Sequence, residues 1–583
     1  MNAPWRPIFD GAPGVPMKVH YTVTWATAPL LRVSNELHDG LNDRESMMKL
    51  RFEQLLLCLL VLPGGGAGGQ TSRTQLATSN HGNADAISAR ELREYLAFIA
   101  SDETEGRATP SRGLDVTAQL LAGHLARWKL RPGGDSGTFF QRIGITRARL
   151  DPPANEAQLG DRHFTLGKDY VVNVFAGTFS GSLVYVSHGW VIRSKGIDAY
   201  RELDVRDKIV IVAETGLPAG VRRADLSGPQ GDDWESPQPA LQRRGARAMI
   251  MVPSFGPLLE FDRRLRDGTE DGIMAPVGSV VRPPLPVVRP SIEMFNALFE
   301  GESQPASLLF NRAAAGDPVP SFALDPARRF TLRVGVREDT LATQNVIAMV
   351  KGSDAVLAKE YVIVSAHYDH LGIGAPVNGD SIYNGADDDG SGSAAVLAMA
   401  RAMGQGARPR RSVLFIWHAG EERQNWGSKY FVQHPTVPLS QIVAALNLDM
   451  VGRTRTSHTD TTRWKVVPPG AIYVVGAKRM SRELGEINDM VNARYLRLAF
   501  DTRFDAPDEP TRLFMRSDHL SYAERGVPVI FYYGGEHEDF HQPSDSADRI
   551  DYQNLEKVAR TVFATTWELA NRSRRPLRDV PRP

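Results

Sequence analysis

The sequence has almost no cysteine. Among its 583 residues the single cysteine is Cys58, so an intramolecular disulfide and a metal site made of thiolates are both excluded. Any bound metal must therefore be held by histidine and carboxylate side chains. That ligand set suits a catalytic site with an open coordination position better than a closed structural site.

The sequence also lacks an excess of charge of one sign and a long hydrophobic run. Lys and Arg together number 68, and so do Asp and Glu, so no overall field points to nucleic acid as a partner. No apolar run reaches the length that crosses a membrane, and we expect no stable membrane anchor. A hydrophobic content of 42% and a charged content of 23% are those of an ordinary globular protein, long enough for more than one domain.

One short apolar run occurs near the N-terminus, in the segment MMKLRFEQLLLCLLVLPGGGAGGQTS. Basic residues precede the run and small residues follow it, an order that predicts a secretory signal peptide over residues 47–70. Because this signal begins inside the chain, we interpret residues 1–46 as a non-native upstream extension. The signal implies a secreted or periplasmic protein. A buried helix near the N-terminus is the alternative interpretation.

The rest of the chain divides into three parts. Residues 85–159 contain two amphipathic helical patterns, the first with Ser88 as its expected N-cap, and are interpreted as the N-terminal part of the main domain. Residues 160–322 carry short β-type runs between Pro- and Gly-rich loops, which predicts a self-contained β-rich insertion without chemistry of its own. Residues 323–575 alternate apolar strands with helical segments. They predict an α/β fold with a mostly parallel, mixed central sheet flanked by helices.

Acidic and histidine side chains stand at the ends of the predicted strands of this last part. Taken singly, a histidine there is usually a packing residue, and an Asp triplet before Gly and Ser is usually a turn and helix cap. Ligands of open α/β sheets bind outside the carboxyl ends of the strands, however, and buried carboxylates gathered there repel one another unless a cation holds them. Two histidines with several carboxylates suit zinc, with manganese or cobalt as substitutes. The residues at this edge are His367, Asp369, Asp387, Glu421, Glu422, Asp449, Asp518, His519 and His541.

Six motifs in this part occur in a recognisable order. They are HYDHLG, NGADDDGSG, GEERQNWGS, NLDMVGR, RSDHLSY and FHQPSD. As an ordered set they resemble the di-zinc exopeptidase family that includes bacterial leucyl aminopeptidases and aminopeptidase Y. The resemblance covers roughly residues 85–571, and residues 160–322 look like the protease-associated domain that several members carry. It implies the mixed α/β fold of zinc-dependent exopeptidases.

The resemblance also implies a role for each site residue. Asp387 would bridge two Zn²⁺ ions, and family members have a cis peptide after that aspartate, which here would be the Asp387–Asp388 bond. Glu421 would be the general base that takes a proton from a metal-bound water. Asp369 would orient a histidine ligand. The implied metal ligands are His367, Asp387, Glu422, Asp449 and His541.

Two positions depart from the pattern of the family. Phe540 stands where some members have a Tyr that donates to the oxyanion, so the donor must come from elsewhere, with Arg516 and Tyr533 as candidates. The loop after the glutamate pair lacks the Gly-Leu of many members and leads into Trp426, which can shape the substrate pocket.

Several other polar residues near the site are also assigned from the sequence. We interpret His541 as the last ligand because it fits the motif. Its rivals in GGEHEDFH are His537, Glu538 and Asp539. Three further histidines are interpreted as packing residues or as supports of the ligands; they are His370, His418 and His519.

The predicted function is a secreted zinc aminopeptidase that acts on peptides with a free N-terminus. A glutamate carboxypeptidase-like enzyme would use the same metals, but it needs an arginine pocket for a terminal carboxylate, for which Arg453 and Arg516 are candidates. A glutaminyl cyclase would use a single zinc, and a receptor-like relative without activity would have lost ligands that this chain retains.

Overall fold

The computed structural model describes residues 81–579 except for 214–215, 227, 255–257, 259, 280–284 and 507–508. The predicted signal peptide (47–70) and the upstream extension (1–46) lie outside the described residues. Within them, no helix is both long enough and apolar enough to cross a membrane.

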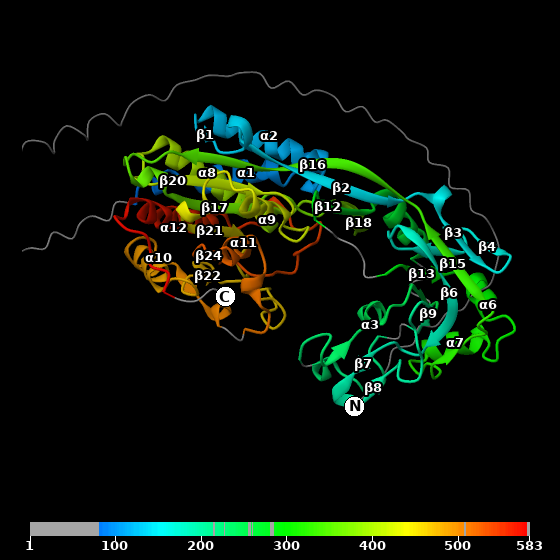
Figure 1. Cartoon of the computed structure of the whole chain (residues 1–583). Helices are drawn as coiled ribbons and strands as arrows, with labels where there is room; N and C mark the ends of the chain where they lie inside the picture. Colours follow the sequence, from blue (N-terminus) through cyan, green and yellow to red (C-terminus); the bar gives the residue numbers. More distant parts are fainter. Residues whose placement is uncertain are drawn as a thin grey trace, which may run out of the picture. The chain divides into compact units, whose positions relative to one another are not determined.

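A large mixed sheet forms the framework of the main domain (Figure 1). Strands β20, β17, β21 and β24 at its centre run parallel, whereas β16 runs antiparallel to β20 and β22 runs antiparallel to β24. The strands, in their order across the sheet, are β12 (Ile273–Pro276), β2 (Phe140–Leu150), β16 (Val336–Val350), β20 (Ser412–His418), β17 (Tyr361–His367), β21 (Ile442–Asp449), β24 (Val529–Tyr533), β22 (Ala471–Val475) and β23 (Ala499–Asp501), with the short β1 (Arg131–Pro132) paired to β16.

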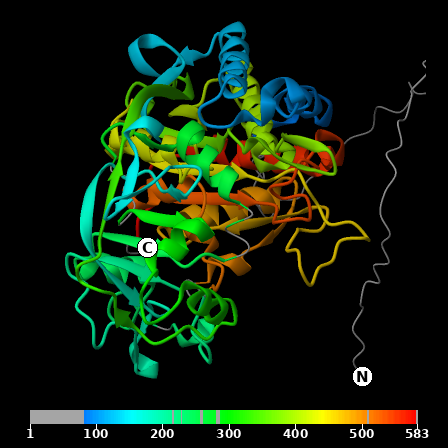
Figure 2. The same cartoon turned by 90° about the vertical axis from the view of Figure 1, so that its right-hand side faces the viewer.

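Helices cover both faces of this sheet because the central strands are apolar on both sides. In β17, Val362 and Val364 pack into one hydrophobic cluster, and Ile363 between them packs into another on the opposite face. Figures 1 and 2 show α1, α2, α8 and α12 together on one side. The helices of the first face are α1 (Ala89–Ile99), α2 (Arg112–Arg127), α8 (Gly392–Gln405), α10 (Arg482–Arg494) and α12 (Tyr552–Asn571); those of the second are α9 (Trp426–Gln433) and α11 (His519–Glu524).

Local signals explain where the first helices begin. The Ser88 hydroxyl accepts a hydrogen bond from the backbone N–H of Glu91 and caps α1, as predicted. Ser111 caps α2 in the same way through the N–H of Leu114. A two-stranded ribbon of β18 (Gly372–Val377) and β19 (Asp380–Tyr383) follows β17.

The insertion contains a second sheet, which starts earlier and ends later than predicted. The segment that forms this sheet runs over residues 156–334 rather than 160–322. Its first strand, β3, pairs with its last strand, β15. Across this sheet the strands are β4 (Arg162–Phe164), β3 (Glu156–Leu159), β15 (Arg329–Val334), β6 (Gly177–Val186), β9 (Ile209–Val212), β11 (Ala248–Met251), β13 (Val287–Pro290) and β5 (Tyr170–Val172), with β14 (Phe322–Ala323) paired to β6; β10 (Trp234–Glu235), β7 (Val191–Ile192) and β8 (Ile197–Asp198) form a small separate sheet.

The insertion is a mixed α/β unit rather than a purely β-rich one. Strands β6, β9, β11 and β13 run parallel to one another, whereas β15 and β5 on either side of them run antiparallel. Helices pack on both faces of the sheet: α3 contacts the face that carries Val210, while α6 and α7 contact the face that carries Ile211. The helices are α3 (Pro237–Arg243), α5 (Phe261–Arg266), α6 (Ile292–Leu298) and α7 (Ala306–Ala314).

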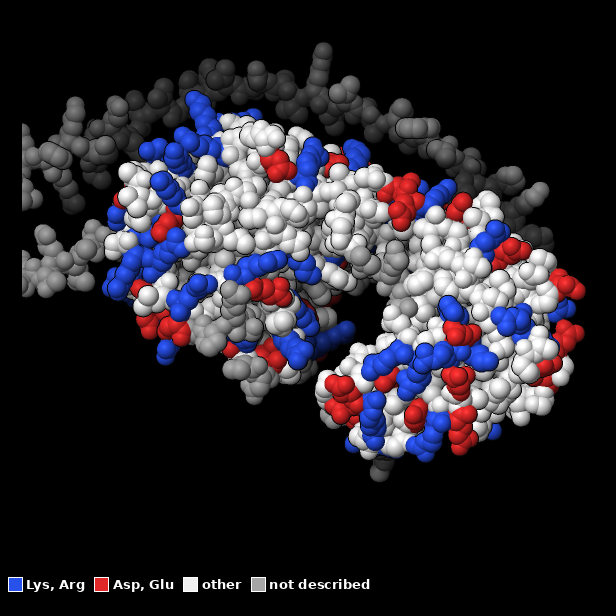
Figure 3. All heavy atoms as spheres, viewed as in Figure 1, with Lys and Arg blue, Asp and Glu red and all other residues white. Residues whose placement is uncertain are grey.

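The surface agrees with the balanced composition. On the face shown in Figure 3, Lys and Arg side chains are interspersed with Asp and Glu side chains. The groups that carry the chemistry are instead buried at one edge of the larger sheet.

Candidate metal centre

The parallel strands of the larger sheet deliver ligand side chains to one edge. Strand β17 ends at His367 beside His418, the last residue of β20, and β21 ends at Asp449 beside Tyr533, the last residue of β24. Because parallel strands place their carboxyl ends at the same edge, the apolar runs that precede these residues also bring them together. These strand-end residues therefore lie at one edge of the sheet.

His367, Asp388 and Asp449 form a first group of converging ligand atoms. The Nε2 atom of His367 lies 3.2 Å from Oδ1 of Asp388 and 3.6 Å from Oδ1 of Asp449. This nitrogen is buried and makes no hydrogen bond. The other ring nitrogen, Nδ1, lies 3.2 Å from the backbone oxygen of Asp369, which leaves Nε2 free to face a cation.

A second group shares Asp388 with the first. It contains His370, Asp388 and Glu422. The Nε2 atom of His541 also approaches it, at 3.1 Å from Oδ2 of Asp388 and 3.4 Å from Oε1 of Glu422. The two groups therefore meet at the carboxylate of Asp388, with one of its oxygens turned to each.

The structure does not place Asp387 in the position expected for the bridging residue. Its Oδ1 accepts a hydrogen bond of 2.6 Å from the N–H of Gly452, and its Oδ2 lies 3.2 Å from Nε2 of His537. The middle residue of the triplet, Asp388, takes the shared position instead. The cis peptide bond is likewise Asp388–Asp389, one residue later than the resemblance implies.

The other acidic groups of this loop hold its backbone in place. The carboxylate of Asp545 accepts hydrogen bonds from the N–H groups of Asp387 and Asp388. The carboxylate of Asp389 accepts from the N–H groups of His367, at 3.2 Å, and Gly392, at 2.9 Å. Burial raises the pKa of Asp389 well above its ordinary value. Asp387 and Asp389 are thus structural neighbours of the cluster, and Asp388 is the residue of the triplet that faces it.

Arg107 fastens the same loops to the N-terminal part of the chain. Its buried guanidinium donates hydrogen bonds to four backbone oxygens. Burial lowers the pKa of Arg107 to about 10, while the charges of nearby carboxylates, including Asp369 and Asp388, oppose that shift. No role was predicted for this residue from the sequence. The four acceptors belong to Ile99, Tyr368, Asn384 and Gly385.

Glu421 stands beside the cluster without joining either group of ligand atoms. Its N–H donates a hydrogen bond of 3.1 Å to Oδ1 of Asp369, so Asp369 positions this glutamate as well as facing His367. Burial raises the pKa of Glu421 well above its ordinary value, and the charges of Asp449 and Asp518 act in the same direction. A buried carboxyl group of this kind can take up and release a proton.

The rival ligands and two of the other three histidines have partners elsewhere. His537 faces Asp387, and Asp539 accepts hydrogen bonds from Arg453 and Arg549. Glu538 lies 3.8 Å from Arg453. Nε2 of His418 pairs with the Tyr522 hydroxyl, and Nε2 of His519 pairs with the backbone oxygen of Phe514. Burial lowers the pKa of both histidines to about 3, in keeping with packing roles.

The candidate oxyanion and substrate residues surround the cluster in different settings. Tyr533 is buried, and burial with the charges of Glu536, Asp449 and Asp388 raises its pKa well above the ordinary value. Arg516 is exposed and donates to Glu536 at 3.0 Å. Trp426 begins α9, and its N–H donates to the oxygen of Gly420. Phe540 stacks on His541, with ring centroids 3.9 Å apart.

The donor set and its unpaired atoms fit divalent cations. Burial lowers the pKa of His541, but the carboxylates of Asp388 and Glu422 outweigh burial and raise it to about 10. The site thus draws positive charge to itself. Histidine nitrogens and carboxylate oxygens that converge without hydrogen bonds are suitable ligands for zinc, manganese or cobalt. In the part of the chain that the structure describes, both groups of this kind lie at this one edge.

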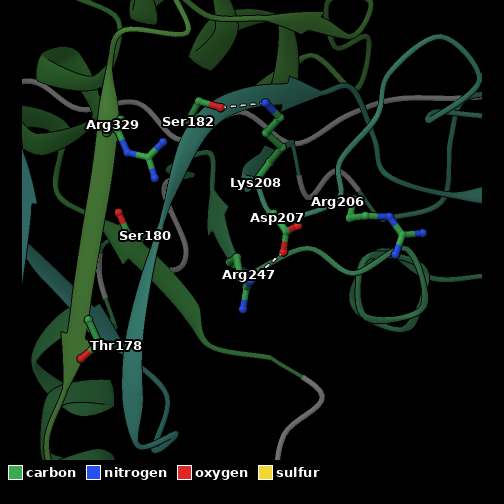
Figure 4. Close-up of a pocket in the computed structure, with 8 residues that line it drawn as sticks. All are labelled: Thr178, Ser180, Ser182, Arg206, Asp207, Lys208, Arg247 and Arg329. Atoms are coloured by element: carbon green, nitrogen blue, oxygen red, sulfur yellow. Dashed lines mark hydrogen bonds and ion pairs between the residues drawn. The ribbon is translucent and has the colours of Figure 1, made fainter.

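The insertion has a polar feature of a different kind. A groove of about 400 Å³ opens on the larger sheet of the insertion (Figure 4). Nζ of Lys208 donates to the Ser182 hydroxyl at 2.9 Å, and Arg247 pairs with Asp207 at 2.7 Å, while Arg206 is turned away from these side chains. A groove dominated by cations is unsuited to a metal ion. Its lining residues are Thr178, Ser180, Ser182, Arg206, Asp207, Lys208, Arg247 and Arg329.

Comparison with known proteins gives one family match. The profile of Peptidase family M28 matches residues 345–566, which include every ligand of both groups. The insertion and Arg107 lie outside the matched range.

Two curated relatives are similar to part of the chain. Leucine aminopeptidase 1 of Arthroderma gypseum is 26% identical over 259 residues, which are 42% of this chain and 62% of that protein. A probable zinc metalloprotease of Pyricularia oryzae is 27% identical over 285 residues, 43% of this chain and 53% of that protein. The chain thus spans less than two thirds of the length of each relative.

Among solved structures, the aminopeptidase from Aneurinibacillus sp. strain AM-1 aligns with a TM-score of 0.48 and 17% identity. The alignment covers 87% of this chain and 100% of that chain.

Proposed function

With residues 345–566 assigned to Peptidase family M28 by the family match, we propose that this protein is a zinc-dependent aminopeptidase that removes N-terminal residues from peptides. The observation that carries the proposal is the pair of ligand groups that share Asp388 at the carboxyl edge of the sheet. A shared carboxylate between two sets of histidine and carboxylate ligands is the arrangement that a two-metal hydrolase requires.

The ligands divide between the two cations around the shared residue. His367 and Asp449 would hold one cation, Glu422 and His541 would hold the other, and Asp388 would contribute to both. When bound, the ions supply a water of lowered pKa and a Lewis acid for the scissile carbonyl. Manganese or cobalt can replace zinc at such ligands.

Glu421 is the residue that moves the proton. Its carboxylate accepts a proton from the attacking water and returns it to the nitrogen of the departing amine. Asp369 keeps this glutamate in place by accepting the hydrogen bond from its N–H. Burial, which raises the pKa of Glu421, favours the uptake of a proton by this carboxylate. Tyr533 and Arg516 remain the candidate donors to the substrate oxygen.

The partners of two arginines favour an aminopeptidase over a carboxypeptidase. Arg453 donates to Asp539 at 3.0 Å, and Arg516 donates to Glu536 at 3.0 Å. Each candidate for binding a terminal carboxylate therefore already faces an acidic side chain. A glutaminyl cyclase needs a single zinc, so two ligand groups argue against it, and a receptor-like relative would not retain Glu421 together with all the ligands.

The finer parts of the proposal concern location and the insertion. Residues 47–70 would act as a signal peptide that directs the protein to the periplasm or the medium, with peptides as its partners. The insertion would be a protease-associated domain; its larger sheet has hydrophobic clusters on both faces, and its strand β12 joins it to the main sheet. Fractionating a bacterial host that expresses the full chain, followed by N-terminal sequencing, tests the signal.

A mixed-sequence peptide with a free N-terminus tests the activity. We expect the purified protein, supplied with zinc, to give products in mass spectrometry that shorten from the N-terminus one residue at a time. A chelator should abolish the series, and added zinc should restore it. The same peptide with an acetylated N-terminus is the matched control and should stay intact.

Two outcomes would overturn the proposed activity. Shortening from the C-terminus would assign the protein to the carboxypeptidases. Intact peptide in the presence of two bound metal ions would favour a binding role.

A further inference from the structure

We propose that His370 is a direct ligand of the second cation, a role that neither its motif nor the family resemblance gives it. The inference rests on the proposed function, because it concerns the same site. It makes the second site one with two histidines and two carboxylates, whereas the first site has one histidine and two carboxylates.

The backbone holds His370 at the site. It follows β17 by three residues, its N–H donates a hydrogen bond of 3.1 Å to the oxygen of Arg107, and its side chain is buried. Gly385 gives the ring its space, since a Cβ atom added there would lie 2.5 Å from the ring. Gly385 also has φ of +55°, a conformation that glycine adopts at least cost. The ring is therefore packed against the aspartate loop and cannot turn away from it freely.

The polar atoms of the ring show where it points. Nδ1 of His370 lies 2.9 Å from Oε1 of Glu422 and 3.7 Å from Oδ2 of Asp388. At 2.9 Å a hydrogen bond is expected, yet neither Nδ1 nor Oε1 has the alignment of one. Two buried polar atoms that approach without bonding to each other are both directed at a third position. That is the relation between two ligands of one metal ion.

Other buried histidines provide the comparison. His418 and His519 each pair one ring nitrogen with a protein oxygen, as packing histidines do. Both ring nitrogens of His370 lack a hydrogen-bond partner, as do those of His537; but His537 approaches a single carboxylate, Asp387, whereas His370 approaches both carboxylates of the second group. A histidine that merely supported Glu422 would donate an N–H to it, and the geometry provides no such bond.

His370 and His541 approach the same two carboxylates. Their ring centroids lie 5.6 Å apart, and both rings reach Oε1 of Glu422 and Oδ2 of Asp388. Zinc and cobalt accept four or five ligands, so both imidazoles can bind one ion together with the two carboxylates. The second site should therefore hold its ion more tightly than the first.

Cobalt(II) binding to cysteine-substituted protein tests the contact directly. Cys58 is the single cysteine, so a Cys58→Ser background carries no thiol. In that background His370→Cys places a thiolate on the side of Nδ1, and the longer metal–sulfur distance, about 2.3 Å against about 2.0–2.1 Å for nitrogen, offsets part of the shorter side chain. A thiolate bound to cobalt gives an intense charge-transfer band in the near ultraviolet. We expect that band with His370→Cys and its absence with His458→Cys, the exposed control.

His370→Gln separates a ligand from a hydrogen-bonding support. Glutamine can still donate to Glu422 but is a poor metal ligand, so we expect it to lower the affinity of one of the two cobalt ions and to change the visible spectrum of that ion. Circular dichroism checks that each variant is folded. An absent charge-transfer band in folded His370→Cys, or a cobalt titration of His370→Gln that matches the parent, would overturn the proposal.

Peptide cleavage is scored separately from metal binding. A parent protein that binds two ions, shows the thiolate band with His370→Cys and leaves the peptide intact would overturn the proposed activity and retain the His370 ligand. Cleavage of the peptide by the parent, with no thiolate band in His370→Cys, would retain the proposed activity and overturn the His370 ligand. A parent that binds no cobalt would overturn both.

Discussion

Both the main domain and the insertion contain neighbouring parallel strands, but their strand ends differ in chemistry. In the main domain, β17 and β21 end in His367 and Asp449. In the insertion, β6, β9 and β11 end in Val186, Val212 and Met251. The strand ends that carry metal-type ligands at β17 and β21 carry apolar residues at β6, β9 and β11. A parallel sheet therefore offers a place for a site, and the residues at its strand ends decide whether a site exists.

The charged groups of the two regions also differ in burial. Asp388 and Glu422 lie in the interior among histidines, whereas Arg206, Arg247 and Arg329 around the insertion groove are exposed. Exposed charges are solvated by water and need no partner, but buried carboxylates are costly without a compensating cation. Substitutions in the two regions should therefore have very different consequences.

The largest effect is expected from the shared ligand. Asp388→Asn should abolish stoichiometric binding of both ions and reduce turnover to background, because it weakens a ligand of each site. The matched variant Asp387→Asn removes only a support of the loop and should weaken metal affinity by about 10–100-fold. Metal content by plasma mass spectrometry and peptide turnover measure both. Equal metal loss in the two variants would contradict the assignment of Asp388 as the shared ligand and of Asp387 as a support of the loop.

The next effect is on the chemical step alone. Glu421→Gln should lower kcat by about 10²–10⁴-fold, the usual contribution of a general base, while the metal content stays unchanged. Glu538→Gln changes a nearby, half-exposed carboxylate and serves as the control, with turnover close to that of the parent. Substantial turnover by Glu421→Gln would assign the proton transfer to another group.

The third effect is on stability rather than on chemistry. Arg107→Met leaves four buried carbonyl oxygens without their donor and should lower the free energy of unfolding by about 3–5 kcal/mol. Denaturant titration measures this free energy. A chelator is present throughout, so that a difference in bound metal does not contribute to the difference between the proteins. The control Arg90→Met, at an exposed position, should change this free energy by no more than about 0.5 kcal/mol. Similar values for the two variants would show that the Arg107 contacts are unimportant.

The smallest effect is expected in the insertion. Arg329→Ala and Lys208→Ala should leave metal content unchanged and turnover of a short peptide within about twofold, in line with surface substitutions of about 0.5 kcal/mol or less. A loss of metal from either variant would show that the insertion supports the metal centre and would remove the contrast between the two regions.

Much of the main domain could be predicted from the sequence because its signals are local. The apolar runs that end at His367 and Asp449 became β17 and β21, and Ser88 became the cap of α1. The choice between Asp387 and Asp388 could not be made in the same way. The triplet lies in an irregular loop with non-helical backbone at Asp388 and Asp389, where neither helical nor strand periodicity tells which side chain points inward.

Two other residues escaped prediction because their partners are distant along the chain or unusual. Arg107 donates to Tyr368 and Gly385, which are 261 and 278 residues away in sequence, and spacing carries no trace of such contacts. His370 follows a strand, where a histidine is more often a packing residue than a ligand. Its unpaired nitrogens could be recognised only once the positions of Glu422 and Asp388 were known.

The most direct test of the central claim is anomalous X-ray diffraction at the zinc absorption edge, from crystals of the protein grown with zinc. The account predicts two peaks, one on each side of the Asp388 carboxylate and about 3.5–4 Å apart, as in two-metal hydrolases. A single peak, or a peak bound to Asp387 in place of Asp388, would contradict it.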